Sequence, residues 1–562
     1  MLERIFPFLA WRVTKETLKH DLTAGITVAL VAIPQSLAYA YLAGLPPHYG
    51  LYAAFIPSIV GALFGSSGQL STGPVALTSL LTAASITPLA AVGTGLFNGY
   101  AAVLALLSGL FQLSFGLFRI GILLNLLSHP VLMGFINAAA IIIAFSQLPS
   151  LTGISSEQSQ YFLRDIWEVI SGIEQLHGPT LAFGLSAICL LIIFKRFFPR
   201  LPGVLITTVL LISVSYELGF VRSGGSVIGD IPKGLPPFGL PVMEWSTTVQ
   251  LVPAAFVIAL VSFMEAMSSC KIIAMKTRRP WNENQELIGQ GLAKIAAGFT
   301  YSMPVSGSFS RSALNLATGA RSGVSSITCA LFVLLTLLFF TRALYYLPRA
   351  VLAAIIMTAV AGLVNAKSIE QAWRASRDDG IAVLSTFTAT LLFAPNIQNG
   401  ALTGIIVSLS LFLYRRMRPR IVQVGLHPDG TLRDAERFNL PPLHEQIGAL
   451  RVDAALNFVN AAYFEEAVLK LDRDNRQLKY ILIAANGINS LDASGVVVLS
   501  TLVEKLRQED IVLVISGVKK QVMDVMEKTG LAKTIGAENI FSADRLALDA
   551  LYTRLNQESA LK

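Results

Sequence analysis

Long apolar stretches, separated by short polar loops, fill the first three quarters of the chain. A membrane-spanning helix needs about 20 consecutive apolar residues, and most of these stretches approach that length. The third and the tenth are shorter. The pattern predicts a polytopic α-helical membrane domain with fourteen segments, at 22–43, 49–65, 74–90, 98–118, 123–147, 177–195, 202–220, 249–270, 286–301, 307–319, 323–342, 347–365, 379–394 and 397–414.

The pattern changes after the Arg-rich run that ends at Arg420. Short strand-like runs occur at 449–456, 480–485 and 511–515, and helical patterns occur at 462–471, 494–507, 520–529 and 544–555. Alternating strands and helices favour an α/β sheet domain. We therefore predict five parts: an N-terminal segment at 1–21, a transmembrane domain at 22–420, a linker at 421–443, an α/β domain at 444–556 and a tail at 557–562.

Composition supports this division. The chain is 53% hydrophobic and only 14% charged, with a mean hydropathy of +0.61. No Asp, Glu, Lys or Arg occurs from Leu22 to Phe118, whereas charges are frequent after residue 445. The net charge of +8 comes from basic residues next to apolar segments, where the positive-inside rule places them, so it does not indicate nucleic-acid binding.

The basic loops also predict the orientation. Basic clusters follow the sixth, eighth, twelfth and fourteenth segments, and placing them all inside together with the N-terminus requires an even number of segments. We expect both termini in the cytoplasm and a location in the cytoplasmic membrane. Each half then holds seven segments, an odd number, so the second half must be inverted relative to the first.

Two motifs interrupt the apolar pattern at corresponding places in the two halves. They are STGPVALT at 71–78 and PVSGSFSRS at 304–312. Paired apolar segments that are short and interrupted by Gly or Pro indicate the substrate site of a transporter. The free N–H groups at the start of such half-helices favour an anion. The chain is therefore interpreted as an anion transporter.

Arg311, Gln35 and Tyr39 place polar side chains within the apolar segments. Arg311 can bind an oxyanion with two parallel hydrogen bonds, or it can be an interfacial arginine that reaches lipid phosphates. Gln35 and Tyr39 share a helix face one turn apart, after a break expected at Pro34. They can line the cavity or form hydrogen bonds between helices.

Glu265 is the only carboxylate in its segment. A charge at the bilayer centre costs about 2.5–3.5 kcal/mol, so such residues usually face a cavity and have a function. Desolvation favours the neutral form, which makes Glu265 a candidate for proton coupling. The alternative is a structural carboxylate that caps a helix or has a partner.

The chain lacks the sequence signals of an enzyme or a cofactor protein. It contains no phosphate-binding Walker loop, no dinucleotide fingerprint, no metal-ligand cluster and no Ser/His/Asp set. In the α/β domain, Asp492 can cap a helix, and Ser494 would lie in its first turn, where phosphorylation would be electrostatically favourable. The alternative is a capped helix without phosphorylation.

Four motifs together resemble the sulfate permease (SulP) family of anion transporters: PQSLAYA at 34–40, STGPVA at 71–76, NQELIGQG at 284–291 and GSFSRS at 307–312. The C-terminal domain, with RVDA at 451–454 and DASG at 492–495, resembles a STAS domain. The resemblance covers nearly the whole chain. It implies a seven-plus-seven inverted repeat with core and gate domains, elevator-like movement of the core, and frequent homodimers.

The resemblance also implies residue roles. In the family, the first segment and the facing ends of the third and tenth segments hold the anion, which here means Gln35, Tyr39, Val75, Ala76, Ser310 and Arg311. Glu265 matches the acidic position of proton-coupled members. The STAS serine pair has Ala493 as its first residue, so the phosphorylation of Ser494 does not carry over directly.

The sequence therefore predicts proton-coupled sulfate uptake. A bicarbonate or C4-dicarboxylate transporter, an uncoupled exchanger or channel, and a sensor whose STAS domain binds a soluble protein remain as alternatives. The expected partners are a small oxyanion, a proton, the lipid bilayer and a second copy of the chain. No cofactor, metal, nucleic acid or enzymatic activity is expected.

Overall fold

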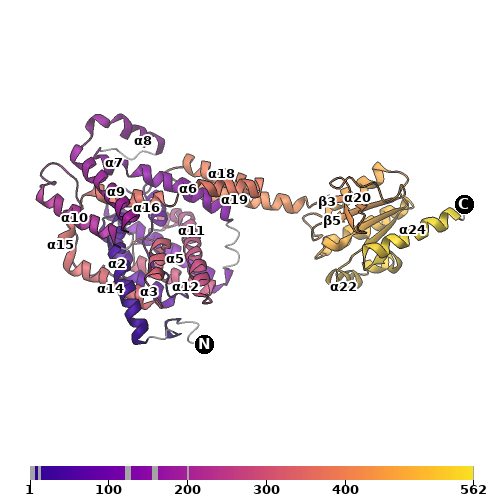
Figure 1. Ribbon diagram of the computed structural model, residues 1–562, viewed down its shortest axis with the longest axis horizontal. Helices are drawn as coiled ribbons and strands as arrows, with labels where there is room; N and C mark the ends of the chain where they lie inside the picture. Colours follow the sequence, from indigo (N-terminus) through magenta and orange to yellow (C-terminus); the bar gives the residue numbers. More distant parts are fainter. Residues whose placement is uncertain are drawn as a thin grey trace. The chain divides into compact units, whose positions relative to one another are not determined.

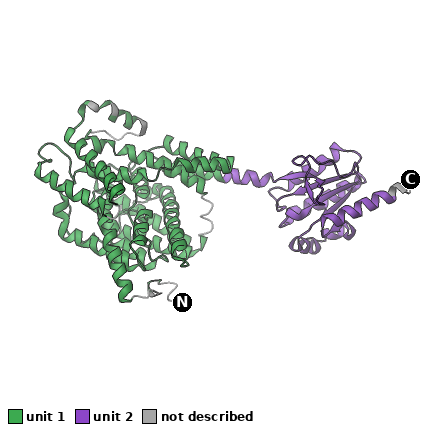
Figure 2. Cartoon of the chain, in the orientation of Figure 1, with its two compact units in different colours: residues 1–408 green, residues 409–562 purple. Residues whose placement is uncertain are grey.

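The structure is a computed structural model, and it divides into two compact units, residues 1–408 and 409–562 (Figure 2). It describes residues 7–10, 14–120, 128–154, 162–198, 201–242 and 244–560. Parts of the expected N-terminal segment (1–6 and 11–13), of the fifth expected segment (123–127) and of the expected tail (561–562) lie outside the described residues.

The first unit is helical (Figure 1). A helix overlaps each of the fourteen expected segments. Eight of the described helices are long and apolar enough to cross a membrane. The helices are α2 (Lys15–Leu42), α3 (His48–Phe64), α4 (Ala76–Ile86), α5 (Gly95–Leu117), α6 (His129–Ser146), α7 (Leu148–Thr152), α8 (Phe162–Ser171), α9 (Gly178–Phe197), α10 (Gly203–Glu217), α11 (Trp245–Thr277), α12 (Glu283–Phe299), α13 (Phe309–Ala317), α14 (Val324–Leu335), α15 (Thr341–Leu344), α16 (Arg349–Ala361), α17 (Ala366–Ala375), α18 (Arg377–Leu392) and α19 (Ile397–Met417).

Short turns and strands complete the first unit. The 3-10 turns are η1 (Pro7–Ala10) and η3 (Ile173–Gln175), and a π-helical turn, η4 (Thr336–Phe340), joins α14 to α15. The strands β1 (Thr72–Gly73) and β2 (Ser306–Gly307) each precede a short helix. Helices α4 and α13 have only 11 and 9 residues, so the prediction of two half-helices is confirmed.

The expected break at Pro34 is wrong. Helix α2 runs without interruption from Lys15 to Leu42, with a buried Pro34 inside it. A proline removes one backbone hydrogen bond and clashes with the preceding turn, but inside a membrane bundle neighbouring helices and local adjustments compensate for it. Gln35 and Tyr39 therefore lie on a continuous helix.

Glycines allow α5 and α12 to pack backbone against backbone. A Cβ on Gly109 would lie 2.8 Å from the carbonyl oxygen of Gly291, and a Cβ on Gly291 would lie 2.6 Å from the amide nitrogen of Leu113. Small residues at helix interfaces permit this close approach. The resulting van der Waals contacts stabilise the helix pair, because the hydrophobic effect does not drive helices together inside a membrane. Helix α12 is thereby held firmly against α5.

The second unit is built on a six-stranded sheet in the order β4-β3-β5-β6-β7-β8 (Figure 1). The pairs β5–β6, β6–β7 and β7–β8 are parallel. The strands are β3 (Ile421–Leu426), β4 (Leu432–Asp434), β5 (Ile447–Val452), β6 (Tyr480–Ala484), β7 (Val512–Ser516) and β8 (Ile540–Phe541), and the helices are α20 (Ala461–Asp474), α21 (Ala493–Gln508), α22 (Lys520–Thr529), α23 (Leu531–Ile535) and α24 (Asp544–Ala560), with the 3-10 turns η5 (Ala485–Gly487) and η6 (Ala537–Asn539).

Alternate residues of the central strands face two separate cores. Ile481 and Ile483 of β6 pack in the core that includes residues of α20–α23, while Leu482 packs in the core that includes residues of α24. The predicted α/β architecture is confirmed. The expected linker at 421–443, however, contains β3 and β4, and β3 pairs with both β4 and β5. The polar and Pro/Gly residues around β4 concealed these two strands.

Candidate functional site

The two interrupted motifs meet in the first unit. Strands β1 and β2 pair antiparallel, with Thr72 opposite Gly307 and Gly73 opposite Ser306. The amide of Ser308 donates to the carbonyl of Ser71 over 2.8 Å, and the amide of Ser71 donates to Oγ of Ser312 over 2.9 Å. These bonds fix the starts of α4 and α13 beside each other.

The start of α4 lacks a side-chain cap. Its N-cap residue, Val75, has an extended backbone, and no side chain among the described residues caps the helix. The first helical residue is Ala76. The first N–H groups of a helix have no acceptor within the helix, so this end of α4 offers backbone donors and a positive dipole end to a ligand.

The start of α13 is different because its own serine caps it. Oγ of Ser308 accepts from the amide of Arg311 over 3.4 Å. Ser310, the second residue of α13, is exposed, and its hydroxyl lies 3.5 Å from that of Ser308. The charge at this end of α13 comes from Arg311.

The guanidinium of Arg311 reaches across to the first motif. Its Nη1 donates to the carbonyl of Pro74 over 3.0 Å, and the whole side chain is only 2% exposed. Its buried Nη2 has no hydrogen-bond partner among the described residues. A Cβ at Gly73 would lie 2.9 Å from this Nη2, so the glycine leaves room for the guanidinium. A buried cationic donor without an acceptor is costly unless a ligand satisfies it.

Helix α2 brings two further predicted residues to the same region. Gln35 and Tyr39 are 8% and 6% exposed, and Oε1 of Gln35 has no partner among the described residues. Tyr39 interacts electrostatically with Arg311 and with Glu265. Helix α2 also contacts both α4 and α13. The uncharged polar groups of α2 therefore lie close to the charged ones.

Glu265 comes from α11, which contacts α4, β2 and α13. The residue is half-buried, and its oxygen Oε2 is fully buried without a partner among the described residues. Arg311 and Lys294 are the positive charges that interact with its carboxylate. The structure thus brings Tyr39, Glu265 and Arg311 together from three separate helices.

One charged residue of this region was missed. Lys294, in α12, is 0% exposed. Its ammonium donates to Oγ of Ser262 over 2.6 Å and to Oε1 of Gln112. A lysine inside the expected segment at 286–301 was the available signal, since intramembrane charges are functional candidates by default.

The model of the sulfate permease family matches residues 18–386 of the chain. The chain belongs to this family. The STAS domain model matches residues 441–545, so the second unit contains a STAS domain. This sulfate permease family member is a multi-pass membrane protein, and its fold is a helical membrane domain followed by a STAS domain.

Two relatives match over nearly the whole chain. The probable sulfate transporter 4.2 of Arabidopsis thaliana is 32% identical, and the match covers 96% of this chain and 82% of the relative. The probable sulfate transporter MT1781 of Mycobacterium tuberculosis (strain CDC 1551 / Oshkosh) is also 32% identical, with 96% of each chain covered.

Solved structures share the fold. The murine Solute Carrier 26 family member A9 anion transporter, solved in the inward-facing state, matches with a TM-score of 0.90 and 21% identity over 98% of this chain and 94% of its own. The transmembrane domain of the cyanobacterium bicarbonate transporter BicA matches with a TM-score of 0.60 and 22% identity over 71% of this chain and 98% of its own.

In the STAS domain, the predicted cap is present. Asp492 accepts from the amide of Gly495 and from the amide of Phe458, each over 2.9 Å. Ser494 is half-buried in the first turn of α21. A regulatory role of Ser494 stays a prediction, because these bonds are those of an ordinary capped helix.

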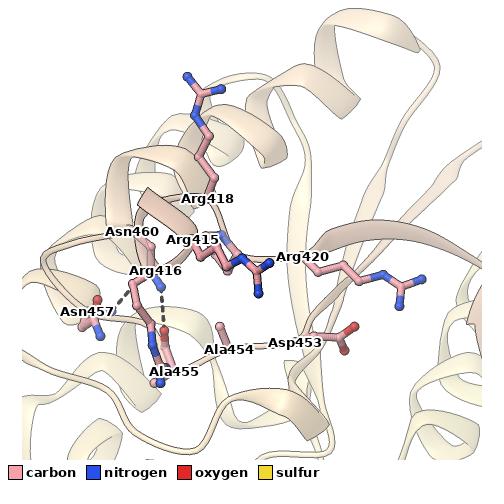
Figure 3. Close-up of a pocket in the computed structure, with 10 residues that line it drawn as sticks. Arg415, Arg416, Arg418, Arg420, Asp453, Ala454, Ala455, Asn457 and Asn460 are labelled. Carbon is pink, nitrogen blue, oxygen red and sulfur yellow. Dashed lines mark hydrogen bonds between the residues drawn. The ribbon is translucent and has the colours of Figure 1, made fainter. Parts of the chain in front are cut away.

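The STAS-containing unit also has a basic pocket of about 340 Å³ (Figure 3). It is lined by the end of α19, by the residues between α19 and β3, and by the loop after β5. Arg416 lies in α19, Arg420 follows it, and Asn457 and Asn460 lie in the loop. Arg420 pairs with Asp434 at 2.5 Å, and Arg416 lies over the ring of Phe412 at 5.3 Å. Asn460 donates to the carbonyl of Ala455. Several of these polar groups thus already have partners within their own unit.

Proposed function

We propose that this protein is a secondary active transporter that takes up sulfate together with protons. The observation that carries this proposal is the buried guanidinium of Arg311. It bridges the two interrupted motifs through the carbonyl of Pro74 and keeps a second nitrogen without a partner among the described residues. An oxyanion between this nitrogen and the start of α4 would satisfy both the guanidinium and the helix N–H groups.

The proposed anion site consists of Arg311, the backbone at Val75 and Ala76, and the polar side chains of Gln35, Tyr39 and Ser310. The N–H groups at the uncapped start of α4 would orient the anion, and Arg311 would supply the positive charge. The names of the sulfate transporters that match nearly the whole chain support sulfate as the oxyanion.

Proton coupling is proposed through Glu265. Importing an anion into an inside-negative cell costs about 2.3 kcal/mol per charge per 100 mV, so a divalent anion needs a cotransported cation. Ionised Glu265 would repel the anion, whereas protonated Glu265 would not. Proton and anion binding should therefore favour each other.

An elevator-like movement is proposed for the transport step. Helices α2–α5 pack with α11–α14, whereas α6, α9, α10, α16 and α18 pack largely with one another. The β1–β2 pair and its flanking bonds tie both half-helices into the first group. The anion site would then move as one piece with that group. A homodimer, cytoplasmic termini and a location in the cytoplasmic membrane complete the proposal.

Uptake by the full-length protein in reconstituted vesicles tests the proposal. Labelled sulfate, bicarbonate and succinate are compared, each with and without an inward proton gradient. Sulfate uptake that the gradient accelerates is expected. A preference for bicarbonate or succinate would show that this anion, and not sulfate, is the substrate. Flux that is independent of the gradient would indicate an uncoupled exchanger or channel.

The variant Glu265→Gln tests the coupling itself because glutamine mimics the protonated state. It should retain sulfate exchange between the two sides of the vesicle but lose the uptake that a pH gradient drives. Glu370→Gln, the same change at an exposed carboxylate that pairs with Arg374, is the control and should retain coupling. Gradient-driven uptake by Glu265→Gln equal to that of the unmodified protein would assign the proton to another group.

A further inference from the structure

Lys294 is a second buried cation that the proposed anion site does not use. It belongs to α12, which packs against α5 and contacts α11 within the helical unit (Figure 1). Its two described hydrogen-bond acceptors, Ser262 and Gln112, are uncharged. A neutral side chain could form the same bonds without the desolvation cost of a charge. The positive charge therefore requires a separate explanation.

The position of Lys294 brings its positive charge close to the proposed anion site. Ser262 precedes Glu265 by one helical turn on α11, so the two share a helix face. Lys294 and Glu265 interact electrostatically, and Glu265 also interacts with Arg311. Oγ of Ser306, in β2, donates to the carbonyl of Ser262 over 2.9 Å and links this turn of α11 to the second motif.

Among the described residues, Glu265 is the charged group that interacts with Lys294, and the other titratable groups of this region have partners of their own. Glu286, two turns before Lys294 on α12, accepts from the amides of Ser66 and Ser67 and from Nε2 of Gln290. Asp21 accepts from the amides of Arg321 and Ser322. Tyr39 and Cys329 interact with Arg311 and are neutral in their ordinary forms. Helices α4 and α5 contain no charged residues.

Among the described residues, the charged groups that interact with one another around the site are thus two cations, Arg311 and Lys294, and one carboxylate, Glu265, that can be protonated. When Glu265 is protonated, the two positive charges balance the charge of one divalent anion. When Glu265 is ionised, they balance the charges of its carboxylate and of one monovalent anion. Without Lys294, a divalent anion would leave an unmatched negative charge even when Glu265 is protonated. Unmatched charge is strongly disfavoured in a desolvated membrane interior.

We propose that Lys294 determines the charge of the transported anion: together with Arg311 it supplies the second positive charge that a divalent oxyanion requires when Glu265 is protonated. This inference rests on the proposed function. It adds a specificity-determining residue that acts through charge, at a distance from the anion, and not through direct contact with it.

The variant Lys294→Gln tests the inference because it removes the charge and keeps a hydrogen-bonding group. Vesicle uptake measures the apparent affinity for sulfate and, in the same preparation, for bicarbonate. The ratio of the two affinities should fall by about tenfold or more in favour of bicarbonate. Lys294→Arg, which keeps the charge, should retain most of the original preference. A purely structural role would lower transport of both anions together.

A second variant covers the case in which Lys294→Gln does not fold. Gln112→Glu leaves the lysine in place and adds a carboxylate at its present acceptor, which neutralises the ammonium within the protein. The same shift toward bicarbonate is expected. An unchanged sulfate-to-bicarbonate ratio in a folded Lys294→Gln or Gln112→Glu protein would overturn the inference.

Arg311→Ala separates this inference from the proposed function. It should weaken the binding of both anions, because it removes the direct ligand. If Arg311→Ala abolishes binding while the Lys294 variants keep the original ratio, the anion site stands and the role of Lys294 fails. If the unmodified protein takes up no sulfate under a proton gradient, both the proposed function and the inference fail.

Discussion

The two interrupted motifs have the same backbone plan and different chemistry. Each places a two-residue strand before a short helix, and the two strands pair with each other. Helix α4 begins after Val75 without a side-chain cap, whereas Ser308 caps α13. The second motif then adds Arg311, which bonds back to the first at Pro74.

This difference makes the proposed anion site asymmetric, although its two motifs occupy corresponding places in the two halves of the membrane domain. If both helix starts were capped, few free donors would remain for a ligand. If both carried an arginine, two guanidinium groups would repel each other inside the membrane. In the proposed site, one half would therefore supply backbone donors and the other would supply charge. Glu265 and Lys294, from α11 and α12, interact electrostatically with each other and are proposed to adjust that charge.

The largest effect is expected from removing the charge of the second motif. Arg311→Ala should lower the apparent affinity for sulfate by about a hundredfold, because a charge-assisted hydrogen bond and a close cation are both lost. Arg311→Lys should retain part of the affinity, since a lysine keeps the positive charge but cannot form the bidentate hydrogen bonds of a guanidinium. Uptake kinetics in vesicles measure both. An unchanged affinity in folded Arg311→Ala would remove Arg311 from the site.

A smaller effect is expected from crowding the first motif. In Gly73→Ala the new Cβ would lie 2.9 Å from Nη2 of Arg311, so the guanidinium must shift. The apparent sulfate affinity should fall about tenfold while the charge is retained. Gly99→Ala is the matched control, because a Cβ added at Gly99 would meet nothing within 4 Å. Equal behaviour of the two variants would contradict the proposed contact between the motifs.

The smallest effect is expected from making the two helix starts alike. Ser308→Ala removes the cap of α13, which costs about 1 kcal/mol and loosens the turn that holds Arg311. The apparent sulfate affinity should fall by a few-fold. Thr94→Ala removes the equivalent cap of α5, where Thr94 accepts from the amide of Phe97. It should lower thermal stability similarly and leave the affinity unchanged; parallel affinity losses would show that capping acts only through stability.

Local pattern was enough to predict much of this protein. The apolar stretches gave the helices of the membrane domain, the interruptions at 71–78 and 304–312 gave the half-helices, and strand–helix alternation gave the α/β domain. Arg311 and Glu265 stood out because a charge inside an apolar segment is costly. These properties depend on residues that are close together in the chain, so the sequence alone reveals them.

Only the tertiary structure decided which distant groups meet. It placed Thr72 opposite Gly307, brought the guanidinium of Arg311 to the carbonyl of Pro74, accommodated Pro34 in a continuous helix, and paired β3 with β5 in the STAS sheet. It also placed Lys294 of α12 against Ser262 of α11, near Glu265. The physical reason is that these contacts arise from packing between helices or strands far apart in the chain, and hydrophobic periodicity carries no information about such pairing.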